Sequence, residues 1–374
     1  MKIGIITITD GANYGNRLQN YALQTVLRNM GHDARTIRHK TKQYSFRSLP
    51  VIAAGINLLK FFLGRETGFC RNKRLRVFED FNKRYIRFSD ETLCPDQASG
   101  GLSDKYDFFV CGSDQIWNTD YSFVREDLTD YLAAFSHPEQ RVAYAASFGT
   151  DRIDPKYRDT FKKELPRFKA VSVRENSGRE IIDALCGRKD TRVVLDPTML
   201  LDADEWRKIE RKPAYIKDEP FVLSYFLCGR NETLTRYIKR TASDFNAVPV
   251  DLDNEFRFDR EITDRDMYLT APEEFVWLID HTQCVLTDSF HACVFSILFH
   301  KPFAAFQRKG SDEGGKRITG RIETLLGRFG LTGFIGNVYD PGIRPENYDI
   351  AYIEDVLRSG REDSMEFIRS GIEK

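Results

Sequence analysis

The sharpest chemical signal in the sequence is the run from Thr287 to His291, which lies between a short apolar stretch and a longer one. This pattern predicts a strand that ends in a polar turn holding Asp288 and Ser289, with His291 at the start of a helix. Histidine titrates near neutral pH and serves as a general acid or base. The alternative is that Ser289 caps the helix and His291 is structural. Because the Gly-x-Ser-x-Gly pattern is missing, a hydrolase triad is disfavoured.

A second polar cluster, residues 112–118, also follows an apolar run. Parallel α/β sheets keep their ligand sites beyond the carboxyl ends of the strands. Trp117 is a candidate for stacking on a sugar ring, and Asp114, Gln115 and Asn118 are candidates for hydrogen bonds to sugar hydroxyls. The alternative is a capped helix start with Trp117 in the core.

The first apolar run, 3–8, leads through a turn that contains Asn13, Tyr14 and Gly15 into a helical pattern. Small residues at such a turn let backbone amides approach an anion at the helix N-terminus. The turn is not GxGxxG, so the dinucleotide fingerprint is absent. The alternative is a tight turn in which Asn16 caps the helix.

Two parts of the sequence contain basic residues that are candidates for binding an anionic ligand. Arg174 follows a strand-like run, and a guanidinium suits carboxylate or phosphate because its N–H donors are paired. A glycine-containing loop carries Lys309 and Arg317 and leads to Arg321, and such a loop can close on a phosphorylated ligand. The alternatives are an ion pair between Arg174 and Glu175, and a solvated surface loop.

Metal signals in the sequence are weak. The six histidines form no HExxH motif and no local cluster. The triplet Asp251-Leu252-Asp253 can hold a divalent ion on a nucleotide sugar, but a plain strand end accounts for it more simply. We therefore predict no metal site.

These motifs require a scaffold of alternating strands and helices. Short apolar, β-branched runs predict strands at 3–8, 34–37, 108–111, 142–146, 171–173, 193–195, 221–227, 248–252, 284–287 and 303–306. Helical periodicity predicts helices at 18–30, 75–85, 157–165, 178–185, 234–245, 272–280, 292–299 and 318–329. Strands that alternate with helices indicate parallel sheets covered on both faces.

A polar stretch with Pro213, residues 202–219, divides this pattern into two halves. We predict an α/β protein with two doubly wound domains that face a cleft, at 1–205 and 206–345. The tail, 346–374, is predicted to be helical and to pack back on the first domain.

Composition narrows the function classes. The chain has 374 residues, with 56 basic and 56 acidic side chains and therefore no net charge, which counts against a dedicated nucleic-acid binder. The seven cysteines are scattered and form no CxxC pair, as in proteins of a reducing compartment. The N-terminal apolar run is too short for a signal-peptide core. We expect a cytoplasmic protein.

The segment 51–63, VIAAGINLLKFFL, is unusually apolar and is followed by several basic residues. It is too short to span a bilayer but suits peripheral contact with the inner face of the membrane. The alternative is a buried helix between the domains or in a homo-oligomer contact.

Taken in order, several segments resemble the polysaccharide pyruvyl transferase family, over about residues 2 to 331. The matching segments are Asn13-Tyr14-Gly15, Leu18-Gln19, Ala22-Leu23, Gly112-Ser113-Asp114-Gln115-Ile116-Trp117-Asn118, Tyr144-Ala145-Ala146-Ser147-Phe148-Gly149, Val173-Arg174-Glu175, Leu195-Asp196-Pro197-Thr198, Thr287-Asp288-Ser289-Phe290-His291, Lys301-Pro302-Phe303 and Arg321-Ile322. The resemblance implies two Rossmann-like halves arranged like a GT-B glycosyltransferase, with the acceptor expected on the first half and the donor on the second. It also implies transfer of pyruvate from phosphoenolpyruvate to a sugar of a cell-surface glycan or its lipid-linked precursor, as a cyclic ketal.

The implied chemistry needs an acid, cations for a carboxylate and a phosphate, and a base near the hydroxyls, and it needs no metal or redox cofactor. By the resemblance, His291 is the proton donor and Arg174 grips phosphoenolpyruvate. Further candidates on the donor side are Ser289, Lys309, Arg317 and Arg321. Asp114 is a candidate base, and the candidates on the acceptor side are Asn13, Tyr14, Gly15, Gln115, Trp117 and Asn118.

One departure from the family concerns the donor. Some members carry Arg two places before the His, where this chain has Ser289, and a hydroxyl cannot replace a guanidinium charge. Either the basic loop supplies that cation or the donor binds differently. The alternative functions are a GT-B-type glycosyltransferase that uses a nucleotide sugar, and a non-catalytic glycan-assembly protein.

Overall fold

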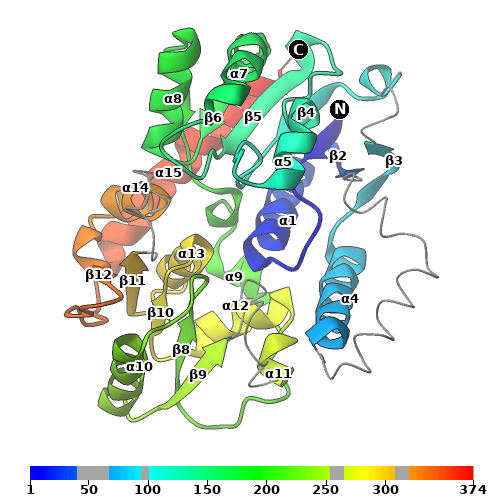
Figure 1. Ribbon diagram of the computed structural model, residues 1–374. Coiled ribbons are helices and arrows are strands. Elements are labelled where there is room, and N and C mark those ends of the chain that lie inside the picture. Colours follow the sequence, from blue (N-terminus) through cyan, green and yellow to red (C-terminus); the bar gives the residue numbers. More distant parts are fainter. Residues whose placement is uncertain (40–66, 94–100, 253–264, 308–319, 374) are drawn as a thin grey trace.

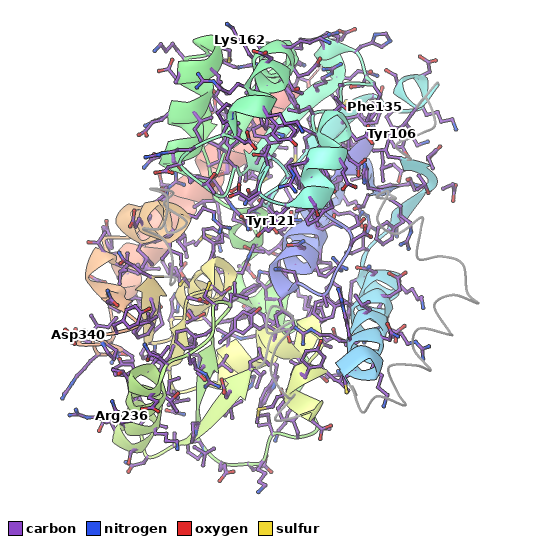
Figure 2. All side chains as sticks on the ribbon, in the orientation of Figure 1. Tyr106, Tyr121, Phe135, Lys162, Arg236 and Asp340 are labelled. Atoms are coloured by element: carbon purple, nitrogen blue, oxygen red, sulfur yellow. The ribbon has the colours of Figure 1, made fainter. Side chains whose placement is uncertain are left out.

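The computed structural model of the protein describes residues 1–39, 67–93, 101–252, 265–307 and 320–373. Two lobes, each built on one parallel sheet, stack one above the other (Figure 1). Side chains fill the space between the ribbons, and the labelled Lys162 and Arg236 mark the two outer ends (Figure 2). The predicted fold class, two doubly wound α/β halves, is confirmed. The segment 51–63 and the loop residues Lys309 and Arg317 lie outside the described residues.

The first lobe holds a seven-stranded sheet in the order β3-β2-β1-β4-β5-β6-β7. Its strands are β1 Lys2–Ile6, β2 Asp33–His39, β3 Phe88–Leu93, β4 Phe108–Cys111, β5 Arg141–Ala146, β6 Ala170–Val173 and β7 Arg192–Val193. Central strands read as continuous apolar runs because both faces are covered; β4, with the sequence FFVC, is buried at every position.

Helices cover both faces of this sheet. They are α1 Tyr14–Asn29, α4 Thr67–Tyr85, α5 Ser122–Glu126, α6 Leu128–Tyr131, α7 Arg158–Glu164 and α8 Asn176–Cys186, with 3-10 turns at Ser103–Lys105, Pro138–Gln140, Pro155–Tyr157, Leu165–Arg167 and Pro197–Met199. Helix α1 begins where Asn13 caps it, since the Asn13 side chain accepts a hydrogen bond from the Asn16 amide. The helix therefore starts directly at the end of the loop that follows β1.

The second lobe holds a five-stranded parallel sheet in the order β12-β11-β10-β8-β9. Its strands are β8 Phe221–Tyr225, β9 Val248–Leu252, β10 Val285–Thr287, β11 Phe303–Gln307 and β12 Ile335–Asn337. Its helices, with the short helix of the connecting segment, are α9 Ala203–Arg207, α10 Glu232–Asp244, α11 Arg265–Tyr268, α12 Pro272–His281, α13 Phe290–Leu298 and α14 Gly320–Arg328, with a 3-10 turn at Thr332–Phe334.

The last helix, α15 Ile350–Ile372, runs from the second lobe back to the first (Figure 1). Ser364 accepts a hydrogen bond from the Leu195 amide at 3.1 Å. Arg361 donates from Nε to the Met199 carbonyl at 2.7 Å. The end of the chain thus packs beneath the first sheet and ties the lobes together. No helix in the described part of the chain is long and apolar enough to cross a bilayer.

Two strands escaped the sequence analysis, and both lie at sheet edges. β3 reads FSDETL, and only Ser89 and Leu93 in it are buried. β12 is three residues long with no buried side chain. Edge strands are half solvated, so they lack the apolar run that marks a central strand.

The strand order reverses direction between β1 and β4 in the first sheet and between β8 and β10 in the second. In open parallel sheets such switch points leave a crevice beyond the carboxyl ends of the strands, where ligands bind. The loops after all four strands meet in one place, which is the candidate active site.

Candidate active site

A cavity between the lobes is lined by the loops that follow both switch points. Its lining residues are Asn13, Tyr14, Gly15, Asp114, Gln115, Tyr225, Leu227, Phe275, Ser289, Phe290, His291 and Arg321. Eight of the predicted site residues are therefore brought together: Asn13, Tyr14, Gly15, Asp114, Gln115, Ser289, His291 and Arg321. They come from four separate segments of the chain, so tertiary structure alone assembles the cluster.

His291 is held by the turn that the sequence predicts. Ser289 caps α13 by accepting a hydrogen bond from the Ala292 amide at 3.5 Å. Asp288 does not line the cavity, and its two oxygens accept hydrogen bonds from the Leu227 and Cys228 amides at 2.6 and 3.0 Å. Asp288 thereby joins the loop after β8 to the loop after β10, and His291 follows on the first turn of the helix.

The imidazole of His291 fits against a residue without a side chain. It is 7% exposed, and a Cβ added to Gly15 would lie 2.1 Å from its Nδ1 atom. Any other residue at position 15 would therefore occupy the space of the ring. The first turn of α1 and the first turn of α13 meet at this contact, across the boundary between the lobes.

Arg174 lies behind the cavity wall in a buried ionic cluster. Its Nη2 donates to Asp114 Oδ1 and its Nη1 to Asp196 Oδ2, both at 2.8 Å. The guanidinium carbon Cζ of Arg174 lies over the ring of Phe290, 4.5 Å from the ring centroid. The side chain is 1% exposed, and it does not line the cavity. The guanidinium is thus committed to two carboxylates and stacked on a ring of the other lobe.

A glycine sets the position of Asp114. Gly112 has a φ of +133°, and a Cβ there would meet the Tyr144 carbonyl at 2.0 Å, so only glycine permits this close approach. Gln19 then fixes the loop by accepting a hydrogen bond from the Ser113 amide at 2.9 Å. Asp114 itself has a left-handed φ of 71°, and it both lines the cavity and accepts the hydrogen bond from Arg174.

Burial and charge shift the titration of this cluster in a consistent way. Burial lowers the pKa of His291, and the neighbouring Arg174 and Arg321 lower it further, against the opposing effect of Asp196 and Asp114. Burial alone would raise the pKa of Asp114 and of Asp196, but Arg174 and His291 outweigh it and hold both values below the ordinary range. Burial thus favours the neutral form of the His291 imidazole, and the neighbouring cations favour the ionised forms of Asp114 and Asp196.

Glu175 completes the cluster as a buried carboxyl group. Burial raises its pKa, with Arg174 and Arg321 acting in the opposite direction. Its Oε1 accepts a hydrogen bond from the Phe148 amide at 3.1 Å, and its Oε2 lies 3.8 Å from Arg174 Nε. The ion pair between Arg174 and Glu175 that the sequence left open is thus a longer contact than the two bonds to Asp114 and Asp196.

The acceptor-side predictions divide into two groups. Gln115 lines the cavity, and its Nε2 donates to the hydroxyl of Tyr121, which is labelled in Figure 2 where the first lobe approaches the second. Asn118 does not line the cavity, and its Nδ2 donates a hydrogen bond to Gln115 Oε1 at 2.8 Å. Trp117 is 1% exposed and packs against Phe148 in the core. In this structure Trp117 therefore offers no face to a sugar.

Aromatic residues that the sequence analysis did not single out do line the cavity. They are Tyr225, Phe275 and Phe290. Asp196, which belongs to one of the matching segments but has no predicted role, lies between Arg174 and His291 in the ionic cluster. The available signal was its place directly after the apolar run 193–195, which puts it at the carboxyl end of a strand.

The cavity suits an anion that carries more than one charged group. The first amides of α1 and α13 have no acceptor within their helices, and both helix N-termini border the cavity. Arg321, 5% exposed, adds a guanidinium from the other side. His291 Nε2 is buried and receives no hydrogen bond from any described residue. N–H donors of the helix N-termini and of Arg321, together with the imidazole of His291, thus surround this small cavity.

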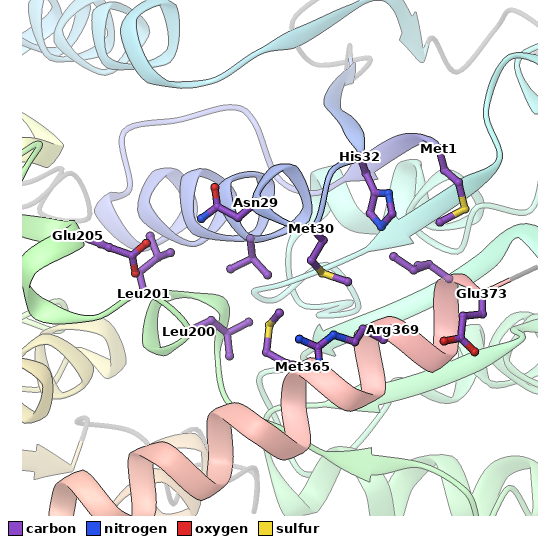
Figure 3. A pocket seen from close by; sticks show the side chains of 12 residues that line it. Met1, Asn29, Met30, His32, Leu200, Leu201, Glu205, Met365, Arg369 and Glu373 are labelled. Atoms are coloured by element: carbon purple, nitrogen blue, oxygen red, sulfur yellow. The ribbon is translucent and has the colours of Figure 1, made fainter.

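Other places in the described chain bear less on chemistry. A larger hollow between α1 and α15 opens at the amino ends of the strands, away from the switch points, and Met30, Met365 and Arg369 line it (Figure 3). Folding also brings together two groups with metal-ligand side chains, which sequence spacing did not reveal: His39, Asp127 and Asp130, and Glu210, Asp280 and His281. Asp251 accepts a hydrogen bond from Ser224 Oγ at 2.9 Å and pairs with Arg230.

Comparisons with known proteins identify the family to which the chain is similar. A family model described as polysaccharide pyruvyl transferase matches residues 13–310. Similar solved structures include a putative UDP-N-acetylglucosamine 2-epimerase from Listeria monocytogenes, at 11% identity and a TM-score of 0.49, with 98% of this chain and 91% of that chain covered. The UDP-GlcNAc 2-epimerase from Neisseria meningitidis has 10% identity and a TM-score of 0.49, with 99% of each chain covered. No curated protein matches the chain at a significant level.

Proposed function

The chain belongs to the polysaccharide pyruvyl transferase family, and on that premise we propose that it transfers pyruvate from phosphoenolpyruvate to a sugar of a cell-surface glycan or of its lipid-linked precursor. The product is a cyclic ketal. We take phosphoenolpyruvate as the donor and assign roles to His291, Arg321 and Asp114, which line the cavity.

One observation carries the proposal: a buried histidine borders a cavity that two helix N-termini and Arg321 also line. Phosphoenolpyruvate carries a carboxylate and a phosphate next to the carbon that must be protonated. Backbone amides and a guanidinium suit the two anionic groups. An imidazole in the same space suits the proton transfer.

The reaction balances with a single acid. Protonated His291 gives its proton to the methylene carbon of phosphoenolpyruvate, which makes the neighbouring carbon an oxocarbenium-like electrophile. One sugar hydroxyl attacks that carbon, phosphate departs, and a second hydroxyl closes the ketal ring. The two hydroxyls release two protons: one restores His291 and the other leaves on the phosphate.

Protonation of His291 requires the donor. The described charges around the ring, Asp114 and Asp196 against Arg174 and Arg321, balance one another, and burial keeps the imidazole neutral. A bound anion adds negative charge in a space of low dielectric and therefore favours the imidazolium. The acid thus forms when its substrate is present.

The ionic cluster changes the expected role of Arg174. Because its Nη1 and Nη2 atoms are already bonded to Asp196 and Asp114, we assign the donor's anionic groups to Arg321 and the amides of the helix N-termini. Arg174 then organises the two carboxylates from behind. With Ser289 capping α13, the helix N-terminus compensates for the guanidinium that some family members carry at that position.

Asp114 faces the acceptor side of the cavity. Its Oδ1 is bonded to Arg174, which leaves Oδ2 for a sugar hydroxyl. The low pKa of Asp114 makes it a weak base, so we expect it to orient the hydroxyl and to take the proton only as the new C–O bond forms. Gln115 and Asn13 are the neighbouring candidates for further hydroxyl contacts.

The test is incubation of the purified protein with phosphoenolpyruvate and a panel of glycans and lipid-linked sugars. The proposal predicts phosphate release that depends on one acceptor, and a product heavier by one pyruvyl ketal. His291→Gln should lower the rate about a hundredfold, the usual contribution of a general acid. Turnover of a nucleotide sugar instead would identify a glycosyltransferase, and full retention of biological activity by His291→Gln would identify a non-catalytic assembly protein.

A further inference from the structure

The two ring nitrogens of His291 have different surroundings. Nε2 is buried and lies 3.7 Å from Asp196 Oδ2. The opposite edge, with Nδ1 and Cε1, lies against Gly15, which lines the cavity and has no side chain to cover that edge. Nε2 thus faces a carboxylate inside the protein, whereas the edge that holds Nδ1 lies against Gly15, a residue of the cavity lining.

Asp196 is itself fixed on every side. Oδ2 accepts hydrogen bonds from Arg174 Nη1 at 2.8 Å and from Ser113 Oγ at 3.0 Å. Oδ1 accepts from the Thr198 amide at 3.1 Å and from its hydroxyl at 2.7 Å. Asp196 is 2% exposed. Four hydrogen-bond donors hold this carboxylate in one orientation. The His291 ring therefore lies opposite a carboxylate of fixed position.

We propose that Asp196 is a positioning residue that keeps the Nε2–H of His291 directed toward its own carboxylate and leaves Nδ1 as the nitrogen that exchanges the proton with the substrate. Nδ1–H is then the bond that breaks when the methylene carbon is protonated. The ring left behind is the neutral Nε2–H tautomer, which Asp196 favours, and a hydroxyl proton returns to Nδ1. The assignment of the substrate rests on the proposed function, whereas the orientation of the ring does not.

Four charged side chains face this ring, from different elements. They are Asp196 after β7, Asp114 after β4, Arg174 at the end of β6 and Arg321 in α14. The Oδ2 of Asp196 lies within 4 Å of Nε2. Of the two carboxylates, Asp114 is the one that also lines the cavity, where an acceptor would compete for it. Asp196 is therefore the carboxylate that can set the tautomer without also binding substrate.

The direct test is ¹⁵N NMR of the histidine rings in the intact, ligand-free protein, with His291 assigned from the spectrum of His291→Gln. The proposal predicts the Nε2–H tautomer for neutral His291. Finding the Nδ1–H tautomer would overturn it, whatever the protein's activity. This measurement needs no phosphoenolpyruvate, so its outcome is independent of whether pyruvyl transfer is the reaction.

The variant Asp196→Asn tests the charge. Losing a carboxylate at this distance should lower the pH midpoint of the His291 titration by about one unit. It should also reduce kcat while KM for phosphoenolpyruvate changes little. Asp280→Asn is the matched control, because Asp280 is another largely buried carboxylate paired with an arginine, Arg207, but lies outside the site. An unchanged His291 midpoint in Asp196→Asn would contradict the proposal, and the wild-type tautomer decides it if that variant fails to fold.

Discussion

Arg174 Nη1 and Asp196 Oδ2 are joined by a buried hydrogen bond of 2.8 Å, and the same carboxylate oxygen lies 3.7 Å from the Nε2 atom of His291. The arginine that the sequence suggested for the donor is thus linked to the proposed acid through a shared aspartate. In the proposed arrangement the donor contacts Arg321 and the amides of the helix N-termini, and the ion pairs of Arg174 stay intact behind them.

Removal of Arg174 should destabilise the protein. In Arg174→Met, Asp114 and Asp196 lose their common cation while buried, which costs about 3–5 kcal/mol for a broken buried pair. Urea unfolding of the purified variant measures this loss. Arg35→Met, which breaks an exposed pair with Asp33, should change stability little. Equal stability of wild type and Arg174→Met would show that the cluster is not the support described here.

The contact between Gly15 and His291 predicts a strict size limit. In Gly15→Ala the new Cβ would fall 2.1 Å from Nδ1 and must displace the ring. A misplacement of about 1 Å can reduce turnover about a hundredfold, and we expect that scale of loss in phosphate release. Gly327→Ala, also in a helix but with open space around it, should keep full activity. Comparable activity of the two variants would place the acid elsewhere.

Donor affinity should depend on pH. The folded pKa of His291 lies below its ordinary value in the free protein, and bound phosphoenolpyruvate raises it, so the complex holds more protons than the free enzyme. Affinity therefore rises as pH falls from the bound pKa toward the free one, by up to about tenfold per pH unit. His291→Gln should remove this dependence except for the donor phosphate's own titration near pH 6, about its second pKa. A wild-type profile that matches the variant's would exclude proton uptake by His291.

Because Trp117 is buried, we expect its removal to lower the stability of the protein and not to weaken acceptor binding. Trp117→Ala should lose about 3–5 kcal/mol in urea unfolding, as other large aromatic deletions in cores do. Trp117→Phe keeps most of the packing and should leave KM for the acceptor unchanged. A large rise in that KM, with stability retained, would restore the sugar-stacking role that the sequence suggested.

Much of the fold could be predicted because central strands of parallel sheets are apolar on both faces. The runs around β1, β4, β8 and β10 identified the strands that border the two switch points, and the polar residues after them identified the loops of the site. β3 could not be recognised, since an edge strand such as FSDETL needs few apolar residues.

The sequence could predict which residues belong to the candidate site, but it could not predict which of their side chains bond to one another. Asn13, Asp114 and His291 follow strands, and that position alone marks them as candidates. The pairing of Arg174 with Asp114 and Asp196 joins positions 60 and 22 residues apart, which no local spacing encodes. Trp117 misled for a related reason: polar residues such as Gln115 and Asn118 lie close to it in sequence, while its neighbours in space are aromatic.

The central claim is that phosphoenolpyruvate binds beside His291 and draws a proton onto it. Calorimetric titration at pH 7, in two buffers with different ionisation enthalpies, measures binding and proton uptake together. The account predicts phosphoenolpyruvate binding whose heat differs between the buffers in wild type and does not differ in His291→Gln. Binding of a nucleotide sugar without phosphoenolpyruvate binding, or phosphoenolpyruvate binding with no proton uptake at His291, would contradict it.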